Sequence, residues 1–319
     1  MKKLLAPMVV ILLAATACGS GNYEATQIPP KVQPSQAAAA PPAAQPNCGN
    51  PLESYTPEGA MPQPLAMPDG SYMEKIQQRG RLIAGVSADS LNLGARNPIT
   101  GKIEGFDIDM VKAVAKAIFG DENKIELRVI SSPQRIPVLK NEQVDIVARN
   151  MTINCARWKQ IAFSAEYYRS GQRTLVPRDE TATSIKQLAG KTICAPAGST
   201  SLDNLKKENP GAVPITADTD TGCLALFQSG KAYAITGDDT VLAGDAAQDP
   251  YAKVLKERFS DEPYGLGMSL KHPEFVRFVN QVLAQSKADG TWMASYNKWL
   301  APALGKLAAP PVAVYGRTP

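Results

Sequence analysis

The pattern of apolar and polar positions in residues 71–149 predicts alternating helices and strands. Residues 104–120, "EGFDIDMVKAVAKAIFG", repeat apolar residues at helical spacing and end at a glycine, as an amphipathic helix does. Its buried stripe is expected to be Met110, Val111, Val114 and Ile118. Helices are also expected at 71–80 and 132–143, and strands at 81–87, 124–130 and 144–149. This order of elements is typical of a largely parallel sheet with helices on both faces.

A second unit of the same kind begins near residue 184. Its expected strands are 191–198, 212–218 and 232–238, and its expected helices are 184–190, 199–210, 221–231 and 239–248. Two further helical patterns, 273–290 and 292–304, close the fold. Two α/β units in one chain favour a ligand-binding cleft between them, because ligands of open α/β sheets bind beyond the carboxyl ends of the strands.

Composition and charge narrow the function. The chain has 319 residues, 44% hydrophobic and 20% charged, which suits about two folded domains. The 34 basic and 30 acidic residues give a formal net charge of +4 without a long basic run, so the sequence does not indicate a nucleic-acid partner. His272 is the only histidine, which disfavours a histidine metal site and Ser-His-Asp catalysis, and we expect no cofactor.

The N-terminus has the pattern of a lipoprotein signal. Lys2 and Lys3 precede a short apolar run that ends in "ATAC", so residues 1–17 are predicted to be a signal peptide. The segment resembles a bacterial lipobox, which implies that Cys18 carries acyl chains such as palmitate and anchors the mature protein at the extracytoplasmic face of the cell membrane. Residues 18–70 are rich in Pro, Ala, Gln and Ser and are predicted to be a disordered stalk.

Four further cysteines suggest two disulfides, because an even number is expected in an oxidising compartment. No C-x-x-C motif occurs, so neither a zinc site nor thioredoxin-like chemistry is favoured. The sequence leaves the connectivity open. Because Cys194 and Cys223 lie in one predicted unit, we predict that they pair and that Cys48 joins the end of the stalk to Cys155.

Short motifs spread over residues 72–302 resemble those of the family 3 solute-binding proteins, the polar amino-acid receptors of ABC importers. In chain order they are "LIAGVS", "GFDID", "MTINCAR", "FSAEYY", "AGSTS" and "GDDTVLAG". Within the family, the chain is especially similar to actinobacterial GlnH-type lipoproteins, which act on glutamate, aspartate or their amides. The resemblance implies a periplasmic-binding-protein-like type II fold, in which two α/β lobes are joined by two hinge strands.

The resemblance also implies where the lobes begin and end. Lobe 1 is expected at residues 71–174 and 266–306, lobe 2 at 175–265, and a C-terminal tail at 307–319. The hinges are then expected near "RTLVPR" and "EPYGLG". Lobe 1 is therefore expected to be discontinuous in sequence.

The resemblance assigns Arg157 to the carboxylate of an α-amino acid, because a guanidinium offers a carboxylate two parallel donors. It implies that the Thr152 hydroxyl joins this site and that Asn150 lines it. From the second lobe, Ser199 and Thr200 of "GSTS" would complete the carboxylate site at a helix N-terminus, where backbone N–H groups suit an anion.

The ligand ammonium also needs an acid, because an unpaired buried charge costs several kcal/mol. Asp238 and Asp239 end a predicted strand and begin a predicted helix. The resemblance favours Asp238 for the ammonium. Asp239 remains the alternative, and its other expected role is an N-cap or a hinge-side partner.

Three more arginines bear on the ligand's side chain. Arg149 follows a predicted strand, Arg173 lies at the expected first hinge, and Arg96 lies in a loop after the first strand. Together they predict a positive cleft that prefers L-glutamate and L-aspartate to L-glutamine and L-asparagine. Each has an alternative: Arg149 could pair with Glu166, Arg173 with a hinge carboxylate, and Arg96 could be solvated.

Three functions are compatible with such a site. The favoured one is a non-enzymatic receptor that delivers an amino acid to an ABC permease, and a sensor that reports to a membrane protein would use the same site. The third is an enzyme resembling cyclohexadienyl dehydratase, which needs an acid–base pair at the cleft. His272 begins a predicted helix and is expected to be a surface or capping residue, which argues against the enzyme.

Overall fold

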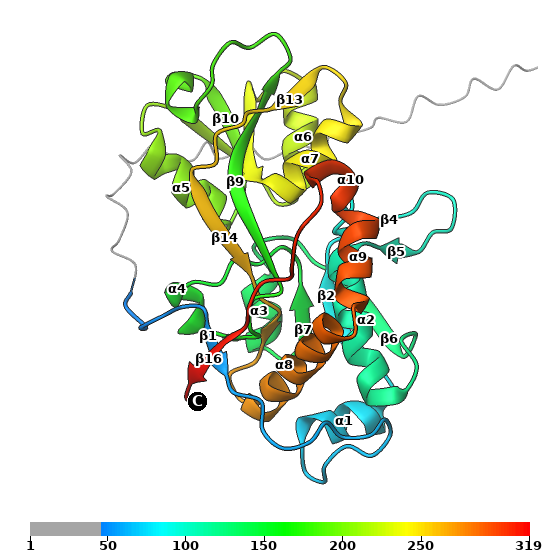
Figure 1. Ribbon diagram of the computed structural model, residues 1–319. Coiled ribbons are helices and arrows are strands. Elements are labelled where there is room, and N and C mark those ends of the chain that lie inside the picture. The colour runs from blue at the N-terminus through cyan, green and yellow to red at the C-terminus, as the bar shows by residue number, and fades with distance from the viewer. Residues whose placement is uncertain (1–45) are drawn as a thin grey trace, which may run out of the picture. The chain divides into compact units, whose positions relative to one another are not determined.

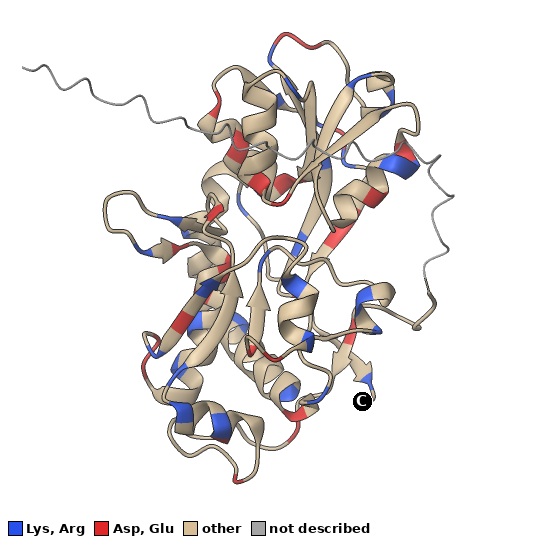
Figure 2. Ribbon diagram, turned by 180° about the vertical axis from the view of Figure 1, so that it is seen from behind, with Lys and Arg blue, Asp and Glu red and all other residues tan. Residues whose placement is uncertain are grey.

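The computed structural model describes residues 46–319, so the predicted signal peptide, Cys18 and the first part of the predicted stalk lie outside the described residues. The described chain forms two α/β lobes, each built on its own sheet, as predicted (Figure 1). Lobe 1 is the part built on a five-stranded sheet, and lobe 2 is the part built on a six-stranded sheet. Lys and Arg are interspersed with Asp and Glu over both lobes (Figure 2).

The sheet of lobe 1 has the strand order β6-β2-β7-β15-β8. Its strands are β2 (Leu82–Val86), β6 (Ile125–Val129), β7 (Ile146–Ala148), β8 (Ala162–Phe163) and β15 (Gly267–Met268). Its helices are α1 (Tyr72–Arg79), α2 (Phe106–Phe119), α3 (Arg135–Lys140), α4 (Cys155–Trp158), α8 (Pro273–Ala288), α9 (Thr291–Trp299) and α10 (Ala301–Leu304). A small sheet of β3 (Asp89–Ser90), β4 (Gly94–Arg96) and β5 (Ile103–Glu104) lies beside α2.

The sheet of lobe 2 has the order β11-β10-β12-β9-β13, and β14 also pairs with β9. Its strands are β9 (Tyr168–Pro177), β10 (Thr192–Pro196), β11 (Val213–Ala217), β12 (Ala234–Asp238), β13 (Ala252–Val254) and β14 (Ser260–Tyr264). Its helices are α5 (Thr200–Glu208), α6 (Asp220–Gln228), α7 (Asp239–Gln248) and the 3-10 helix η1 (Ile185–Leu188).

The predicted amphipathic helix is confirmed as α2. Gly105 precedes it with a φ of 144°, and Gly120 ends it in the left-handed conformation, which glycine adopts without steric cost. The predicted stripe of Met110, Val111, Val114 and Ile118 is buried in the core of lobe 1. This helix packs on β2 and β7 and begins at the edge of the sheet that faces lobe 2.

Two antiparallel strands, β9 and β14, connect the lobes, and their pairing runs from Tyr168–Tyr264 to Gln172–Ser260. Within lobe 2, Arg173 pairs with Gly237 of β12. The expected first hinge at residues 173–178 therefore lies inside lobe 2, and the chain crosses between the lobes near Tyr168 instead. The apolar pattern of "RTLVP" did not reveal this shift, because β9 is one continuous strand through both regions.

Residues 46–70 are folded against lobe 1, which corrects the predicted extent of the stalk. β1 (Glu53–Tyr55) pairs in parallel with β16 (Val314–Arg317), so the expected tail is also part of the fold. Tyr55 and Met67 are buried in the lobe 1 core. The prediction of a stalk rested on the average composition of the segment, which does not reveal a few apolar residues that pack into the core.

Both predicted disulfides are confirmed. Cys48 is bonded to Cys155 of α4, and Cys194 of β10 is bonded to Cys223 of α6. The first joins the N-terminal segment to lobe 1, and the second lies within lobe 2. Within residues 46–319 no helix is both long and apolar enough to span a membrane.

Candidate functional site

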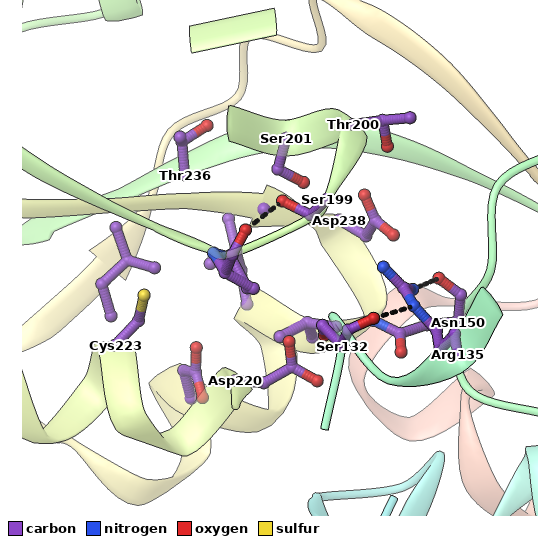
Figure 3. Close-up of a pocket in the computed structure, with 16 residues that line it drawn as sticks. Ser132, Arg135, Asn150, Ser199, Thr200, Ser201, Asp220, Cys223, Thr236 and Asp238 are labelled. Atoms are coloured by element: carbon purple, nitrogen blue, oxygen red, sulfur yellow. Dashed lines mark hydrogen bonds between the residues drawn. The ribbon is translucent and has the colours of Figure 1, made fainter. Parts of the chain in front are cut away.

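A cavity lies between the two lobes, near the carboxyl ends of β7, β10 and β12 (Figure 3). Its lining includes four of the residues predicted for the site, Asn150, Ser199, Thr200 and Asp238. Further polar lining residues are Ser132, Arg135, Ser201, Asp220, Thr236 and Asp245. Its volume is about 20 Å³, which is room for roughly one water molecule. An amino acid therefore needs the lobes to move apart.

Arg157 lies on the one-turn helix α4 and is not among the residues that line the cavity. Asn154 caps the helix by accepting the backbone N–H of Arg157 at 2.9 Å. The guanidinium is buried and donates from Nη1 to the Thr152 carbonyl at 2.7 Å and from Nη2 to the Gly198 carbonyl at 3.4 Å. Burial lowers the pKa of Arg157. Among residues 46–319 no carboxylate lies within 4.0 Å of it.

Arg135 is a second buried guanidinium; it lines the cavity, and the sequence interpretation missed it. It is the first residue of α3, and it donates to the carbonyls of Asn150 at 3.2 Å and Gly198 at 3.3 Å. Burial, followed by the nearby Arg157 and Arg149 charges, lowers its pKa well below the usual value. It likewise has no carboxylate within 4.0 Å in the described part of the chain. Its position just after strand β6, at the edge where ligands bind, was a signal that could have found it.

Thr152 and Thr200 bring their hydroxyls together across the lobes, 3.2 Å apart. Both donate to the same oxygen of Glu262 on β14, at 2.6 and 2.7 Å. The other oxygen of Glu262 accepts from Asn204 at 2.9 Å and Ser260 at 2.6 Å. A hydroxyl has one proton to donate, so neither threonine has a proton left for a further acceptor. Thr200 lines the cavity and Thr152 does not. Sequence reasoning missed Glu262, which accepts the protons of both hydroxyls in this structure.

Asn150 has an unusual backbone, with φ at 37° in the left-handed region. Asp107, on the first turn of α2, holds it there by accepting the Asn150 N–H at 2.9 Å. Tyr167 donates to the other Asp107 oxygen at 2.7 Å. Burial raises the pKa of Asp107 to about 6. The side-chain oxygen of Asn150 is buried and finds no partner in the described residues.

Asp238 and Asp239 have different surroundings. Asp238 is buried in the cavity wall and accepts from the Tyr264 hydroxyl at 2.6 Å, while its second oxygen has no partner among the described residues. Burial, with the nearby Glu262 charge, raises the pKa of Asp238 well above its usual range. Asp239 turns toward β9, where Ser170 donates to it at 2.6 Å and the Arg173 Nε lies 3.9 Å away.

The loop between β10 and α5 faces the arginines. Ser199 is the N-cap of α5, since its hydroxyl accepts the Leu202 N–H at 3.2 Å. Gly198 has a φ of 65°, and a Cβ there would come within 3.3 Å of the Pro133 Cα in lobe 1. Glycine thus allows the Gly198 carbonyl to approach both guanidinium groups.

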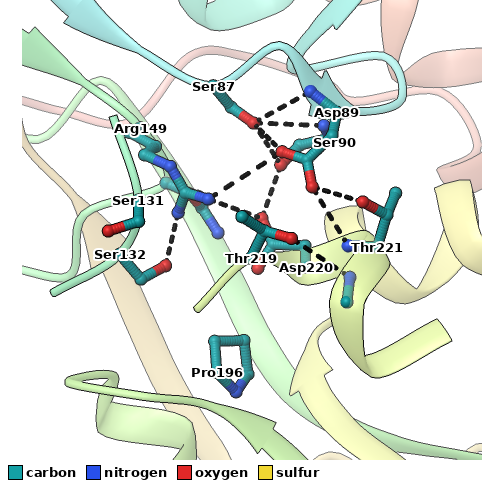
Figure 4. A network of polar contacts seen from close by, with 12 residues as sticks. Ser87, Asp89, Ser90, Ser131, Ser132, Arg149, Pro196, Thr219, Asp220 and Thr221 are labelled. Carbon is teal, nitrogen blue, oxygen red and sulfur yellow. Dashed lines mark hydrogen bonds and ion pairs between the residues drawn. The ribbon is translucent and has the colours of Figure 1, made fainter. Parts of the chain in front are cut away.

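Arg149 does not line the cavity. It is fully buried behind Ser132, and its Nε donates to the Ile130 carbonyl at 2.9 Å. Its Nη2 lies 3.8 Å from Asp220 and 3.9 Å from Asp89, in a network that joins the lobes (Figure 4). The alternative pairing of Arg149 with Glu166 is wrong, because Arg169 takes that carboxylate.

The other two predicted specificity arginines also lie away from the cavity. Arg96 is exposed on β4 and donates to the Gly101 carbonyl at 2.7 Å, so its solvated alternative holds. Arg173 donates to the Lys256 carbonyl at 2.6 Å and lies near Asp239, the hinge carboxylate of its alternative. Both side chains point away from the cavity, and their positions in the sequence did not show on which side of the strand they would lie.

Two more acids of lobe 2 line the cavity. Asp220 accepts from Ser90 of lobe 1 at 2.5 Å. Asp245, on α7, is buried with one oxygen unpartnered among the described residues, and burial raises its pKa well above the usual value. His272 lies outside the cavity lining, stacked on Tyr72 with ring centroids 3.7 Å apart. Within residues 46–319 no group of three metal-binding side chains is arranged to hold an ion.

Comparisons with known proteins agree on one family. The model of the bacterial extracellular solute-binding proteins, family 3, matches residues 82–302. The chain is 44% identical over 196 residues to a glutamine-binding protein of Geobacillus stearothermophilus, covering 61% of this chain and 75% of that one. It is 30% identical over 229 residues to the glutamate-binding protein GluB of Corynebacterium glutamicum, covering 67% and 77%. The ancestral amino acid-binding protein AncCDT-1, a precursor of cyclohexadienyl dehydratase, matches with a TM-score of 0.66 and 32% identity, covering 72% and 99%.

Proposed function

Because the chain belongs to the bacterial extracellular solute-binding proteins, family 3, we propose that it is an amino-acid receptor that closes its two lobes on L-glutamate or L-aspartate. The captured amino acid would pass to the permease of an ABC importer. The names of the relatives, a glutamine-binding and a glutamate-binding protein, support this ligand class. The acyl anchor at Cys18 and the extracytoplasmic location remain part of the proposal, resting on the N-terminal sequence.

One observation carries the proposal: the buried Arg135 guanidinium and the buried, half-unpartnered Asp238 carboxylate line one cavity, and the buried Arg157 guanidinium reaches the loop beside it. Within residues 46–319 the hydrogen bonds of Arg157 and Arg135 go only to carbonyls, and no carboxylate lies within 4.0 Å of either guanidinium. One oxygen of Asp238 has no partner there. Unpaired buried charges are costly, so such a site favours a ligand that supplies the opposite charges. An α-amino acid carries both an anion and a cation.

We assign the ligand's α-carboxylate to Arg157, whose planar fork can donate two parallel hydrogen bonds. We assign the ammonium to Asp238 together with the hydroxyls of Thr152 and Thr200. These hydroxyls accept rather than donate, because Glu262 takes both of their protons. The ammonium has three protons and no lone pair, so it suits three acceptors.

Arg135 supports an acidic side chain on the ligand. Its guanidinium points into the space between the lobes, beside Ser132 and Asn150 (Figure 3). With Arg157 committed to the α-carboxylate, Arg135 is a second cation that a neutral amide would leave unpaired. We therefore propose that L-glutamate and L-aspartate bind more tightly than L-glutamine and L-asparagine, with Arg135 in the role first predicted for Arg149 and Arg173.

Calorimetric titration of the protein with all twenty amino acids tests the ligand class. We expect saturable binding of L-glutamate and L-aspartate, weaker binding of their amides, and none of L-lysine or L-arginine. Prephenate and L-arogenate turnover, measured on the same preparation, separates a receptor from a dehydratase. Tighter binding of L-glutamine than of L-glutamate would refute the acidic specificity, and turnover would refute the receptor. A sensor would bind the same amino acids, so amino-acid uptake is measured in cells that lack the protein. Reduced uptake would indicate delivery to a permease, and unchanged uptake would indicate signalling.

A further inference from the structure

The helix α4, which carries Arg157, is held from outside by both ends of the described chain (Figure 1). A helix of four residues has no stability of its own, so tertiary contacts must fix its position. At its start, Cys155 is bonded to Cys48. At its end, Trp158 is buried, and its indole N–H donates to the Pro51 carbonyl at 2.8 Å.

Arg317, near the C-terminus, also contacts Trp158. Its guanidinium lies over the indole ring, 4.2 Å from the ring centroid, which is a cation–π geometry. Its Nε donates to the Glu53 carbonyl at 2.8 Å and its Nη2 to the Asn50 carbonyl at 2.9 Å. One side chain thus joins the C-terminal strand, the N-terminal segment and α4.

The two terminal segments are in turn attached to lobe 1. Strand β1 pairs with β16, and Ser54 of β1 donates to the Phe163 carbonyl at 2.7 Å. Asn280 of α8 donates to the Ser54 hydroxyl at 2.9 Å. We call residues 48–55 and 314–317 the terminal clamp. It connects α4 to the lobe 1 core without contributing to the cavity lining.

We infer that the terminal clamp positions Arg157 for the ligand carboxylate, with Arg317 as its central positioning residue. This inference rests on the proposed role of Arg157 in ligand binding. Cys155 and Trp158, on either side of Arg157, are held by the clamp, while the Arg157 guanidinium reaches the other way to Thr152 and Gly198. A bidentate contact tolerates little displacement, so loosening α4 weakens the contact even when the fold survives.

Titration of the full mature chain with L-glutamate tests the inference, in parallel with L-aspartate, L-glutamine and L-asparagine. We expect Arg317→Ala to raise the Kd about tenfold for each amino acid that binds, because the α-carboxylate is common to all of them. Arg317→Lys keeps a cation for the indole but not the forked donors, so its Kd should lie between those of the wild type and Arg317→Ala. Arg178→Ala is the matched control, since Arg178 also donates to a carbonyl, that of Pro250, but lies in lobe 2.

A double-mutant cycle separates positioning from general destabilisation. In an Arg157→Lys background, which retains charge but not the bidentate fork, Arg317→Ala should change the Kd less than about twofold. An equal change in both backgrounds would overturn the inference, as would wild-type affinity in a folded Arg317→Ala protein that binds L-glutamate. If Arg317→Ala does not fold, Trp158→Phe serves as the test variant in its place. This substitution loses only the hydrogen bond from the indole N–H to the Pro51 carbonyl and part of the aromatic ring. Absence of binding by the wild type to all four amino acids would instead refute the proposed function.

Discussion

The Tyr264 hydroxyl donates to Oδ2 of Asp238 at 2.6 Å, while Oδ1 of that carboxyl, in the wall of the cavity between the lobes, has no partner within residues 46–319. Tyr264 lies at the end of β14 and Asp238 at the end of β12, so the contact joins the interlobe strand to the ligand site. Burial raises the pKa of Asp238, and Tyr264 only partly offsets that effect. Asp238 therefore holds a proton in the ligand-free protein over a wider pH range than an exposed aspartate.

We predict that ligand binding releases this proton. The ligand ammonium favours ionised Asp238, so its pKa falls on binding, and affinity rises with pH until the pKa of the free protein is passed, by up to about tenfold per pH unit. Calorimetry in two buffers of different ionisation enthalpy measures the released protons. Asp238→Asn should abolish the release and cost about 2 to 5 kcal/mol of binding. The control Asp239→Asn should retain it, and proton uptake instead of release would contradict the assignment.

The second prediction concerns Glu262, because this carboxylate fixes the direction in which the Thr152 and Thr200 hydroxyls donate. Glu262→Gln removes a charge and replaces an acceptor by an N–H donor, so Thr152 and Thr200 become free to turn their protons toward the cavity. The site would then repel the ligand ammonium, and we expect a loss of roughly 1 to 3 kcal/mol in binding free energy. Asp261→Asn, an exposed neighbour on the same strand, is the matched control. Equal affinities of the Gln variant and the wild type would show that the hydroxyls do not face the ligand.

Gly198 yields a prediction about lobe closure. Its φ of 65° disfavours a side chain, and a Cβ there would lie 3.3 Å from the Pro133 Cα, a tight contact across the lobes. Gly198→Ala should cost roughly 1 kcal/mol in backbone strain, and the contact with Pro133 should also hold the lobes apart. Small-angle scattering with saturating L-glutamate should show a smaller decrease in radius of gyration than for the wild type. Gly190→Ala, also at positive φ but in open space, controls for strain alone.

The sequence predicted most elements of the fold, for physical reasons that differ from those governing the site. The periodicity that identified α2 reflects burial of Met110 and Val114, which one segment determines by itself. The cysteine pairing followed from chain proximity and parity. That Arg135 and not Arg149 lines the cavity depended instead on tertiary packing, which places the Arg149 guanidinium near Asp89 and Asp220 outside the cavity lining.

The final prediction separates the roles of the two buried guanidinium groups, those of Arg157 and Arg135. Arg157→Ala should weaken binding of acids and amides alike by about 2 to 5 kcal/mol, because every amino acid has the α-carboxylate that it would bind. Arg135→Ala should weaken L-glutamate and L-aspartate more than L-glutamine and L-asparagine, because only the acids supply a second carboxylate. Arg96→Ala, an exposed arginine of lobe 1, should change neither. The four amino acids titrated into each folded variant give the comparison. If Arg135→Ala weakened acids and amides equally, Arg135 would be an organiser of the Asn150 and Gly198 carbonyls and not the residue that selects the side chain.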